Sequence, residues 1–110
     1  MIIDVKNAGM SISELYRLVT SAAVPRPIAL VSTVSKTGVY NVAPYSYFNF
    51  VSTDPLMLMF APILDGKGEK KDSHKNAETT GEFVVNIVNE AMAAQVNQSS
   101  AEYAPEVDEF

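Results

Sequence analysis

Four of the chain's ten aromatic residues fall within six positions, directly after Pro44. The segment, residues 45–50, reads YSYFNF. Aromatic faces, backbone N–H groups and an Asn amide suit a flat heteroaromatic ring, which needs stacking and a few hydrogen bonds at its edge. A strand end that leads into a loop is a common place for such a site. The alternative is that these aromatic side chains only fill the core.

A second candidate site lies where a short helix is expected to begin. Residues 70–73 read KKDS. Free N–H groups at a helix start, the Ser73 hydroxyl and the Lys71 ammonium group together suit a phosphate. Ser32 and Thr33, at the end of a predicted strand, would add hydroxyl donors. The alternative is an ordinary helix cap beside solvated lysines. Together the two segments predict a phosphorylated aromatic ligand such as a nucleotide or a flavin.

Several other chemistries lack the residues that they need. The chain has no Cys, which excludes disulfides, cysteine zinc sites and thiol catalysis. His74 is the only histidine and the acidic residues are dispersed, so we expect no metal site. We expect His74 itself at the surface; the alternative is that it meets an anion. The sequence contains no glycine-rich phosphate loop. The residues for Ser-His-Asp hydrolysis are present, but no nucleophile-elbow motif supports it.

Charge is distributed unevenly along the chain. The net charge is −5, yet residues 1–75 carry eight bases and six acids, whereas residues 76–110 carry seven acids and no base. Half of the bases fall within residues 67–75. A basic cluster in an acidic chain indicates a local anion site rather than a nucleic-acid surface, where positive charge extends over a whole face. We therefore expect no nucleic-acid partner.

The elements that must position these residues are short. Apolar and β-branched runs predict four strands, over residues 28–34, 39–43, 56–61 and 82–88. The first has the composition of a strand buried on both faces, and a turn at residues 35–38 joins it to the second in a hairpin. Pro44 is expected to end the second strand.

Helical spacing and capping residues predict three helices, over residues 11–21, 72–80 and 89–98. Ser11 and Glu14 have the spacing of a capping box at the start of the first helix. Asp72 or Ser73 is expected to be the N-cap of the second helix, which Gly81 ends. Asn89 is expected to cap the third.

A length of 110 residues indicates a single domain over residues 1–110 with one core, and an acidic, irregular tail over residues 99–110. Strands clustered early, with helices between the later elements, favour a mainly β fold with helices, either a β-barrel or α+β, over a doubly wound sheet. Four strands cannot close a barrel, so either an edge stays open or a partner completes it.

No apolar stretch approaches the roughly 20 residues that span a bilayer, and the N-terminus lacks the pattern of a signal peptide. We therefore expect no membrane association and a cytoplasmic location.

The sequence resembles a known family in five blocks, in order and spacing over about residues 11–98. The blocks are PRPIALVST at 25–33, NVAPYSYFN at 41–49, DP at 54–55, KDSHKN at 71–76 and GEFVVN at 81–86. They are similar to the flavin reductase-like, FMN-binding split-barrel flavoproteins.

The resemblance implies an FMN-dependent oxidoreductase, usually a homodimer with the flavin between subunits. NAD(P)H would deliver a hydride to flavin N5, and the electrons would pass to a second flavin, to oxygen or to a partner monooxygenase. The chemistry belongs to the cofactor, which fits the lack of a visible acid–base pair and leaves catalytic residues unassigned.

The resemblance also implies roles for eight residues. The phosphate or ribityl end would be held by Ser32, Thr33, Lys71 and Ser73. The isoalloxazine would be lined, largely through backbone groups, by Ser46, Tyr47, Phe48 and Asn49.

Domains of this family commonly run to about 150–200 residues, whereas the chain stops at Phe110. The resemblance therefore implies a C-terminally truncated domain and an incomplete split barrel. An apolar edge would then be exposed, which predicts oligomerisation or aggregation.

Two hypotheses follow, a dimeric FMN-binding flavin reductase and a non-catalytic half-domain that associates with itself or a partner. Nucleic-acid binding by a small barrel is a third, against which the acidic C-terminal third argues.

Overall fold

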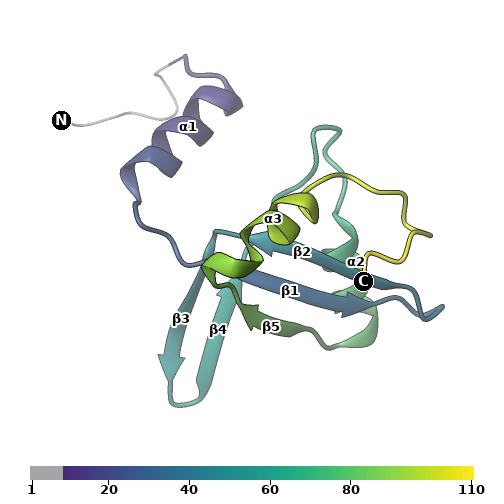
Figure 1. Cartoon of the computed structure of the whole chain (residues 1–110). Coiled ribbons are helices and arrows are strands. Elements are labelled where there is room, and N and C mark those ends of the chain that lie inside the picture. The colour runs from purple at the N-terminus through teal and green to yellow at the C-terminus, as the bar shows by residue number, and fades with distance from the viewer. Residues whose placement is uncertain (1–8) are drawn as a thin grey trace.

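A computed structural model describes residues 9–110, which contain five strands and four short helical elements (Figure 1). The strands are β1 (Ala29–Val34), β2 (Tyr40–Tyr45), β3 (Phe48–Thr53), β4 (Leu56–Phe60) and β5 (Val84–Ile87). The helices are α1 (Ile12–Ala22), α2 (Asp72–Thr80), the 3₁₀ turn η1 (Glu90–Met92) and α3 (Ala93–Gln98). The expected class, mainly β with helices, is confirmed. The prediction about a signal peptide concerns residues 1–8, which lie outside the described residues.

The first sheet has the strand order β2-β1-β5, and both pairings are antiparallel. The predicted hairpin of β1 and β2 is confirmed, but two details were wrong. Pro44 does not end β2, because β2 is an edge strand and Pro44, opposite Leu30, needs no ladder N–H there. Burial along β1 alternates instead of covering both faces, since Ala29, Val31 and Thr33 are buried whereas the residues between them are half-buried.

The aromatic segment forms a fifth strand, where a strand end leading into a loop was expected. After a two-residue corner at Ser46 and Tyr47, β3 pairs with β4 in a separate antiparallel hairpin. A register shift between Phe50 and Ser52 marks a bulge in β3. The prediction of four strands was wrong because the alternation of polar and aromatic residues here is a strand pattern.

The capping residues explain the helix ends. Ser11 and Glu14 form the predicted capping box, in which the Ser11 N–H donates to Glu14 Oε2 at 2.8 Å. Asn89 accepts from Met92 N–H and caps η1, whereas the N-cap of α3 is Met92, so the single helix predicted over residues 89–98 is divided into a 3₁₀ turn and a short α-helix. Gly81 ends α2 at φ 79°, a left-handed conformation that glycine adopts freely. The predicted N-cap of α2 was wrong, because Lys71 holds that position and its side chain makes no capping bond.

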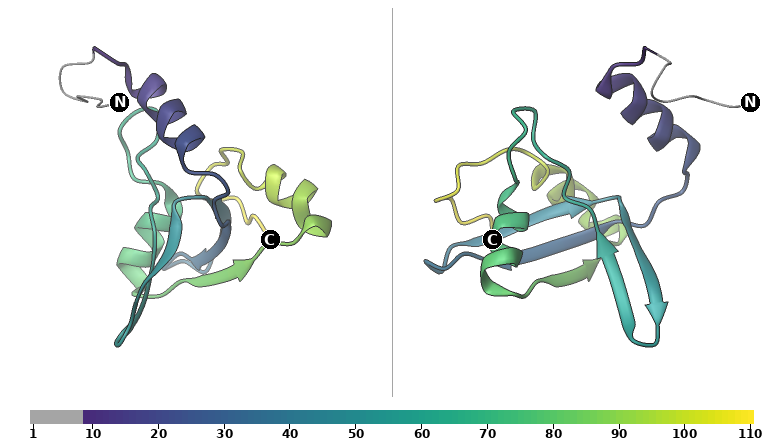
Figure 2. Two further views of the ribbon diagram at one scale, coloured as in Figure 1. Left: turned by 90° about the vertical axis from the view of Figure 1, so that its left-hand side faces the viewer. Right: turned by 180° about the vertical axis from the view of Figure 1, so that it is seen from behind.

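A small core lies where the first sheet meets the hairpin of β3 and β4, which we call the hairpin from here on. It contains Ala29, Val31, Tyr45 and Phe48, with Phe60 packed against it. The rings of Tyr45 and Phe60 lie 5.1 Å apart, in tilted contact. α2 and α3 lie on opposite sides of the sheet (Figure 2, left). The core thus holds the end of β2 and the start of β3 in place.

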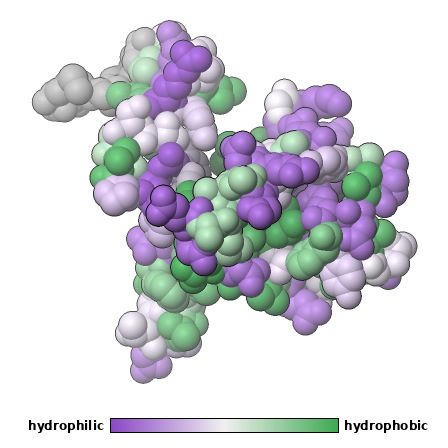
Figure 3. Space-filling view, viewed as in Figure 1, coloured by the Kyte–Doolittle hydropathy of each residue, from purple (hydrophilic) through white to green (hydrophobic). Residues whose placement is uncertain are grey.

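Much apolar surface remains exposed. α1 stands away from the sheets (Figures 1 and 2), and none of its residues is buried. Leu56 of the hairpin and Ile87 of β5 are 72% and 71% exposed. Figure 3 shows apolar side chains gathered over the hairpin and beside the sheet. No helix within residues 9–110 combines the length and the apolar character needed to cross a membrane.

Residues 99–110 contain no helix or strand, and their end returns to β2. The Glu109 N–H donates to the Tyr40 carbonyl at 3.2 Å, and the Val42 N–H donates to Glu109 Oε2 at 3.0 Å. The rings of Tyr40 and Phe110 lie 5.5 Å apart. The acidic segment therefore covers the outer edge of β2.

Candidate functional site

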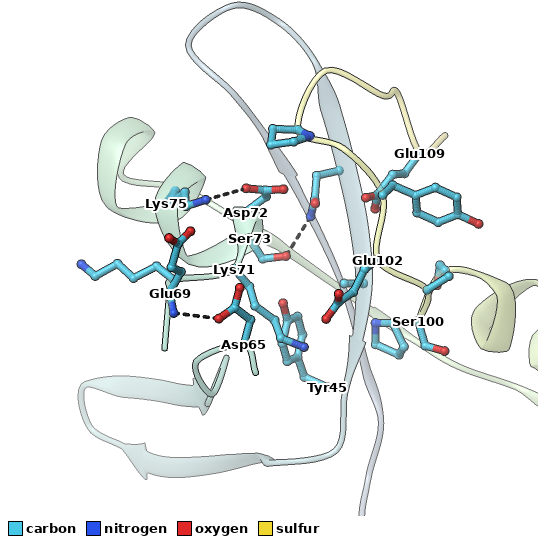
Figure 4. A pocket seen from close by; sticks show the side chains of 18 of the residues that line it. Tyr45, Asp65, Glu69, Lys71, Asp72, Ser73, Lys75, Ser100, Glu102 and Glu109 are labelled. Atoms are coloured by element: carbon cyan, nitrogen blue, oxygen red, sulfur yellow. Dashed lines mark hydrogen bonds and ion pairs between the residues drawn. The ribbon is translucent and has the colours of Figure 1, made fainter. Parts of the chain in front are cut away.

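A cavity of about 390 Å³ lies between β2, the start of α2 and residues 99–109. Figure 4 shows Lys71, Asp72 and Ser73 on the α2 side, and Glu102 and Glu109 on the side of the acidic segment. Asn41, Ala43, Pro44 and Tyr45 of β2 also line the cavity. The basic cluster and the acidic segment, distant in sequence, therefore face one space.

The lysines around this cavity differ in whether they are paired. Lys70 contacts Glu78 at 2.6 Å, and Lys75 contacts Asp72 at 3.1 Å. The hydrogen bond from Lys70 is the main cause that lowers the pKa of the Glu78 carboxyl. Within residues 9–110, Lys67 and Lys71 line the cavity and form no ion pair. These two ammonium groups are the ones available to an anionic ligand.

A smaller cavity of about 120 Å³ lies beside the first. Tyr16 of α1, Ser46 and Tyr47 of the β2–β3 corner, and Ile63 line it. The rings of Tyr16 and Tyr47 lie 6.3 Å apart. Pro44, Tyr45 and Lys71 line both cavities, so the two spaces adjoin at these three residues.

Arg26 anchors the corner that forms the smaller cavity. Its Nη1 donates to Ser46 Oγ at 2.6 Å, and its guanidinium lies 5.8 Å from the centre of the Tyr47 ring. This is a hydrogen bond combined with a cation–π contact. Sequence reasoning did not assign Arg26 to a site; its position between two prolines, in an extended stretch before β1, was the signal that could have found it.

Behind the larger cavity, four polar side chains are buried together. They are Thr33 of β1, Asn41 of β2, and Ser73 and Asn76 of α2. Asn41 Nδ2 donates to Ser73 Oγ at 2.8 Å and to Thr33 Oγ1 at 3.4 Å, and Asn76 Nδ2 donates to Thr33 Oγ1 at 3.1 Å. We call these residues the buried polar cluster. Buried polar groups need such partners, so the cluster fixes α2 on the sheet.

Four of the eight predicted site residues line a cavity. Lys71 and Ser73 line the larger one, where Ser73 is only 1% exposed. Ser46, Tyr47 and again Lys71 line the smaller one. The structure thus brings together the predicted phosphate and ring segments through Lys71.

The other four residues lie elsewhere. Thr33 is inside the buried polar cluster, and Ser32 is on the opposite face of β1, 3.4 Å from Asn86 Nδ2. Phe48 is in the core. Asn49 is exposed, and its side chain accepts from the Phe50 N–H. Contact of these four with a ligand stays a prediction.

Tyr45 and Glu109 also face the larger cavity, although sequence reasoning did not assign them there. Burial raises the pKa of the Tyr45 phenol, and the side chain of Ser73 opposes that rise. Burial likewise raises the pKa of the Glu109 carboxyl, against the Val42 N–H, which lowers it. Glu109 reaches this place only because residues 99–110 turn back to β2, which no local pattern indicates.

His74 is half-buried, and its Nε2 lies 3.2 Å from Glu78 Oε1. Its buried Nδ1 has no hydrogen-bond partner among the described residues. In residues 9–110, no three His, Asp or Glu side chains are grouped as metal ligands.

Comparison with known proteins places the chain among relatives of similar sequence. The model of the flavin reductase like domain matches residues 21–110. An uncharacterised protein of Aquifex aeolicus is 45% identical over 96 residues, which are 87% of this chain and 49% of that protein. The Bacillus subtilis protein YwrF, also uncharacterised, is 38% identical over 92% of this chain and 49% of its own length. The chain spans about half the length of these curated relatives.

Solved structures agree with this match. Nitrilotriacetate monooxygenase component B from Bacillus cereus superposes with a TM-score of 0.88 at 37% identity, over 99% of this chain and 54% of that one. The 2-nitrobenzoate 2-nitroreductase of Pseudomonas fluorescens gives 0.78 at 34% identity, over 96% and 50%. A split barrel domain protein from Shewanella frigidimarina shares the fold, with a TM-score of 0.77 at 20% identity, over 100% and 54%. The fold is that of the flavin reductase split barrel, and this chain belongs to the flavin reductase-like domain family.

Proposed function

We propose that the chain binds FMN in the two adjoining cavities and takes part in an NAD(P)H-dependent flavin oxidoreductase. The observation that carries the proposal is that Pro44, Tyr45 and Lys71 line both cavities. A ligand with an anionic end and an aromatic end can therefore occupy both cavities at once. Lys71 would lie beside the part of the ligand that joins the two ends.

The donors of the larger cavity fit the phosphate end of FMN. Lys67 and Lys71 form no ion pair within residues 9–110. The first N–H groups of α2 lack partners inside the helix, and Lys71 gives no side-chain cap. Glu102 and Glu109 line the opposite wall. We therefore place the phosphate at the start of α2, because the acidic wall repels it.

The smaller cavity fits the aromatic end. Ser46 and Tyr47 line it, Tyr45 and Tyr16 add two more rings, and Arg26 holds the corner from behind. Tyrosine faces stack on flat rings and keep a polar edge for hydrogen bonds. When bound, FMN supplies the redox chemistry, accepting a hydride from NAD(P)H at N5 and passing two electrons to an acceptor. The protein's residues bind and orient the ring and the phosphate.

We further propose that the chain acts as a homodimer in the cytoplasm and that a monooxygenase or another acceptor takes the electrons. The likeness to a protein named as a monooxygenase component supports the acceptor. The exposed apolar residues of β5 and the hairpin support association.

Titration with FMN and with riboflavin tests the binding proposal, and the quenching of flavin fluorescence measures the binding. We expect saturable binding of both, and Lys71→Ala should weaken FMN about tenfold while changing riboflavin little, because only FMN carries the phosphate. Lys36→Ala is the control, since Lys36 lies in the β1–β2 turn and lines neither cavity. A folded chain that binds neither flavin, or equal losses for both in Lys71→Ala, would contradict it.

A second candidate function is a non-catalytic half-domain that associates with itself or a partner. The exposure of Leu56 and Ile87 favours it, since such apolar side chains are usually covered. NADH oxidation measured with excess FMN separates the candidates. The half-domain predicts no turnover even where FMN binds.

A further inference from the structure

The start of α2 is oriented by a contact that comes from outside the helix. Lys71, the N-cap, makes no side-chain capping bond. Ser73, two residues later, is 1% exposed and accepts from Asn41 Nδ2 at 2.8 Å, a bond that joins residues 32 apart (dashed in Figure 4). The position of the first turn of α2 therefore depends on a strand of the sheet.

Asn41 is the centre of the buried polar cluster. Its Nδ2 carries two hydrogens, and the two acceptors within reach are Ser73 Oγ and Thr33 Oγ1. Thr33 Oγ1 also accepts from Asn76, so β1, β2 and α2 are held through one set of side chains. Removing Asn41 would leave buried hydroxyl groups without these bonds, which is costly.

The cluster also reaches the cavity wall. Asn41 and Ser73 both line the larger cavity, together with Tyr45. The bond between Asn41 and Ser73 is thus part of the lining of the larger cavity, which also contains Tyr45, a residue that lines both cavities. Lys71 begins the same helical turn as Ser73.

We propose that Asn41 is a positioning residue, which holds the first turn of α2 so that Lys71 and the first N–H groups of the helix face the phosphate of FMN. This inference rests on the proposed function. Asn41 acts through Ser73, and its effect is preorganisation. When the first turn of α2 is already held in place, none of the binding free energy is used to order it.

The test compares Asn41→Ala with Asn86→Ala in the full chain. Asn86 is a matched control, because its amide also bonds to β1, at the Leu30 carbonyl and Ser32 Oγ, but it is exposed and lines neither cavity. We expect Asn41→Ala to raise the Kd of FMN about tenfold while that of riboflavin changes less than about twofold. Asn86→Ala should change neither. A merely structural loss would weaken both flavins equally.

Ser73→Ala is the second variant, because it removes the bond between Asn41 and α2 and leaves the bond between Asn41 and Thr33. If Asn41 acts through Ser73, the double variant Asn41→Ala/Ser73→Ala loses no more FMN affinity than Ser73→Ala alone. Additive losses would overturn the proposal.

Amide hydrogen exchange in the absence of ligand gives an independent readout. We expect faster exchange at residues 72–76 in Asn41→Ala, with β5 unchanged. Unchanged exchange at the start of α2 overturns the positioning role. Failure of the proposed function looks different, since the unsubstituted chain would then bind neither FMN nor riboflavin.

Discussion

At the scale of single residues, the side-chain bonds beside the two cavities join positions that lie far apart in the sequence. Lys71 was predicted to meet an anion, and it lines both cavities without an ion pair in the described part of the chain. Ser73 was predicted as a helix cap, yet its hydroxyl is buried against Asn41. That bond joins residues 32 apart, and no local pattern reports such a partner. Arg26 lies between two prolines, which was a local signal, but its partner Ser46 lies 20 residues away and could not be predicted from such a signal.

Arg26 gives the prediction that belongs to this scale. Replacing Arg26 by Ala removes the bond to Ser46 Oγ and the contact with the Tyr47 ring. The corner at the smaller cavity then loses its anchor, so riboflavin and FMN should weaken by the same factor, about tenfold. Fluorescence titration measures both, with Arg17→Ala on exposed α1 as the control. An effect on FMN alone would place Arg26 at the phosphate instead.

At the scale of elements, the pattern of the chain predicted most boundaries. The capping box of α1, the hairpin of β1 and β2, and the end of α2 at Gly81 are confirmed. The missed element was β3, because four aromatic residues in six suggested a ligand segment more strongly than a strand. Phe48 lies in the core, as the alternative interpretation predicts, whereas Tyr47 lines a cavity, and its contact with a ligand stays a prediction.

Gly81 and Gly66 test the backbone argument at α2. A Cβ at either position meets no atom within 4 Å, so only conformation separates them. Gly81 has φ +79°, whereas Gly66 is not among the glycines with positive φ. Gly81→Ala should lower the free energy of unfolding by about 1 kcal/mol, and Gly66→Ala should leave it unchanged or raise it slightly. Urea unfolding measures both, and equal effects would contradict the assignment.

At the scale of the whole molecule, the sequence predicted the family and the exposure of apolar surface. The core is small, with Ala29, Val31, Tyr45 and Phe48 as its buried apolar residues. The sequence does not predict what covers the apolar surface, because contacts between separate segments or chains produce no periodic pattern of residues. The same limit hid the return of residues 99–110 to β2.

Ile87 tests whether β5 takes part in association. It is 71% exposed on the last strand of the sheet, so Ile87→Lys should shift the chain towards the monomer, because a charge there opposes pairing. Analytical ultracentrifugation over a concentration series measures the shift. Ile12→Lys, on α1 at 89% exposure, is the matched control and should have no effect. An unchanged mass distribution for Ile87→Lys would exclude β5 from the interface.

The two edges of the three-stranded sheet differ, and the difference limits how molecules can stack. Glu109 occupies Val42 N–H and the Tyr40 carbonyl on the β2 edge, whereas β5 ends the sheet on the other side. Within residues 9–110, the outer edge of β5 is therefore the one at which a further strand can pair with this sheet. The acidic segment thus prevents a further strand from pairing with the outer edge of β2.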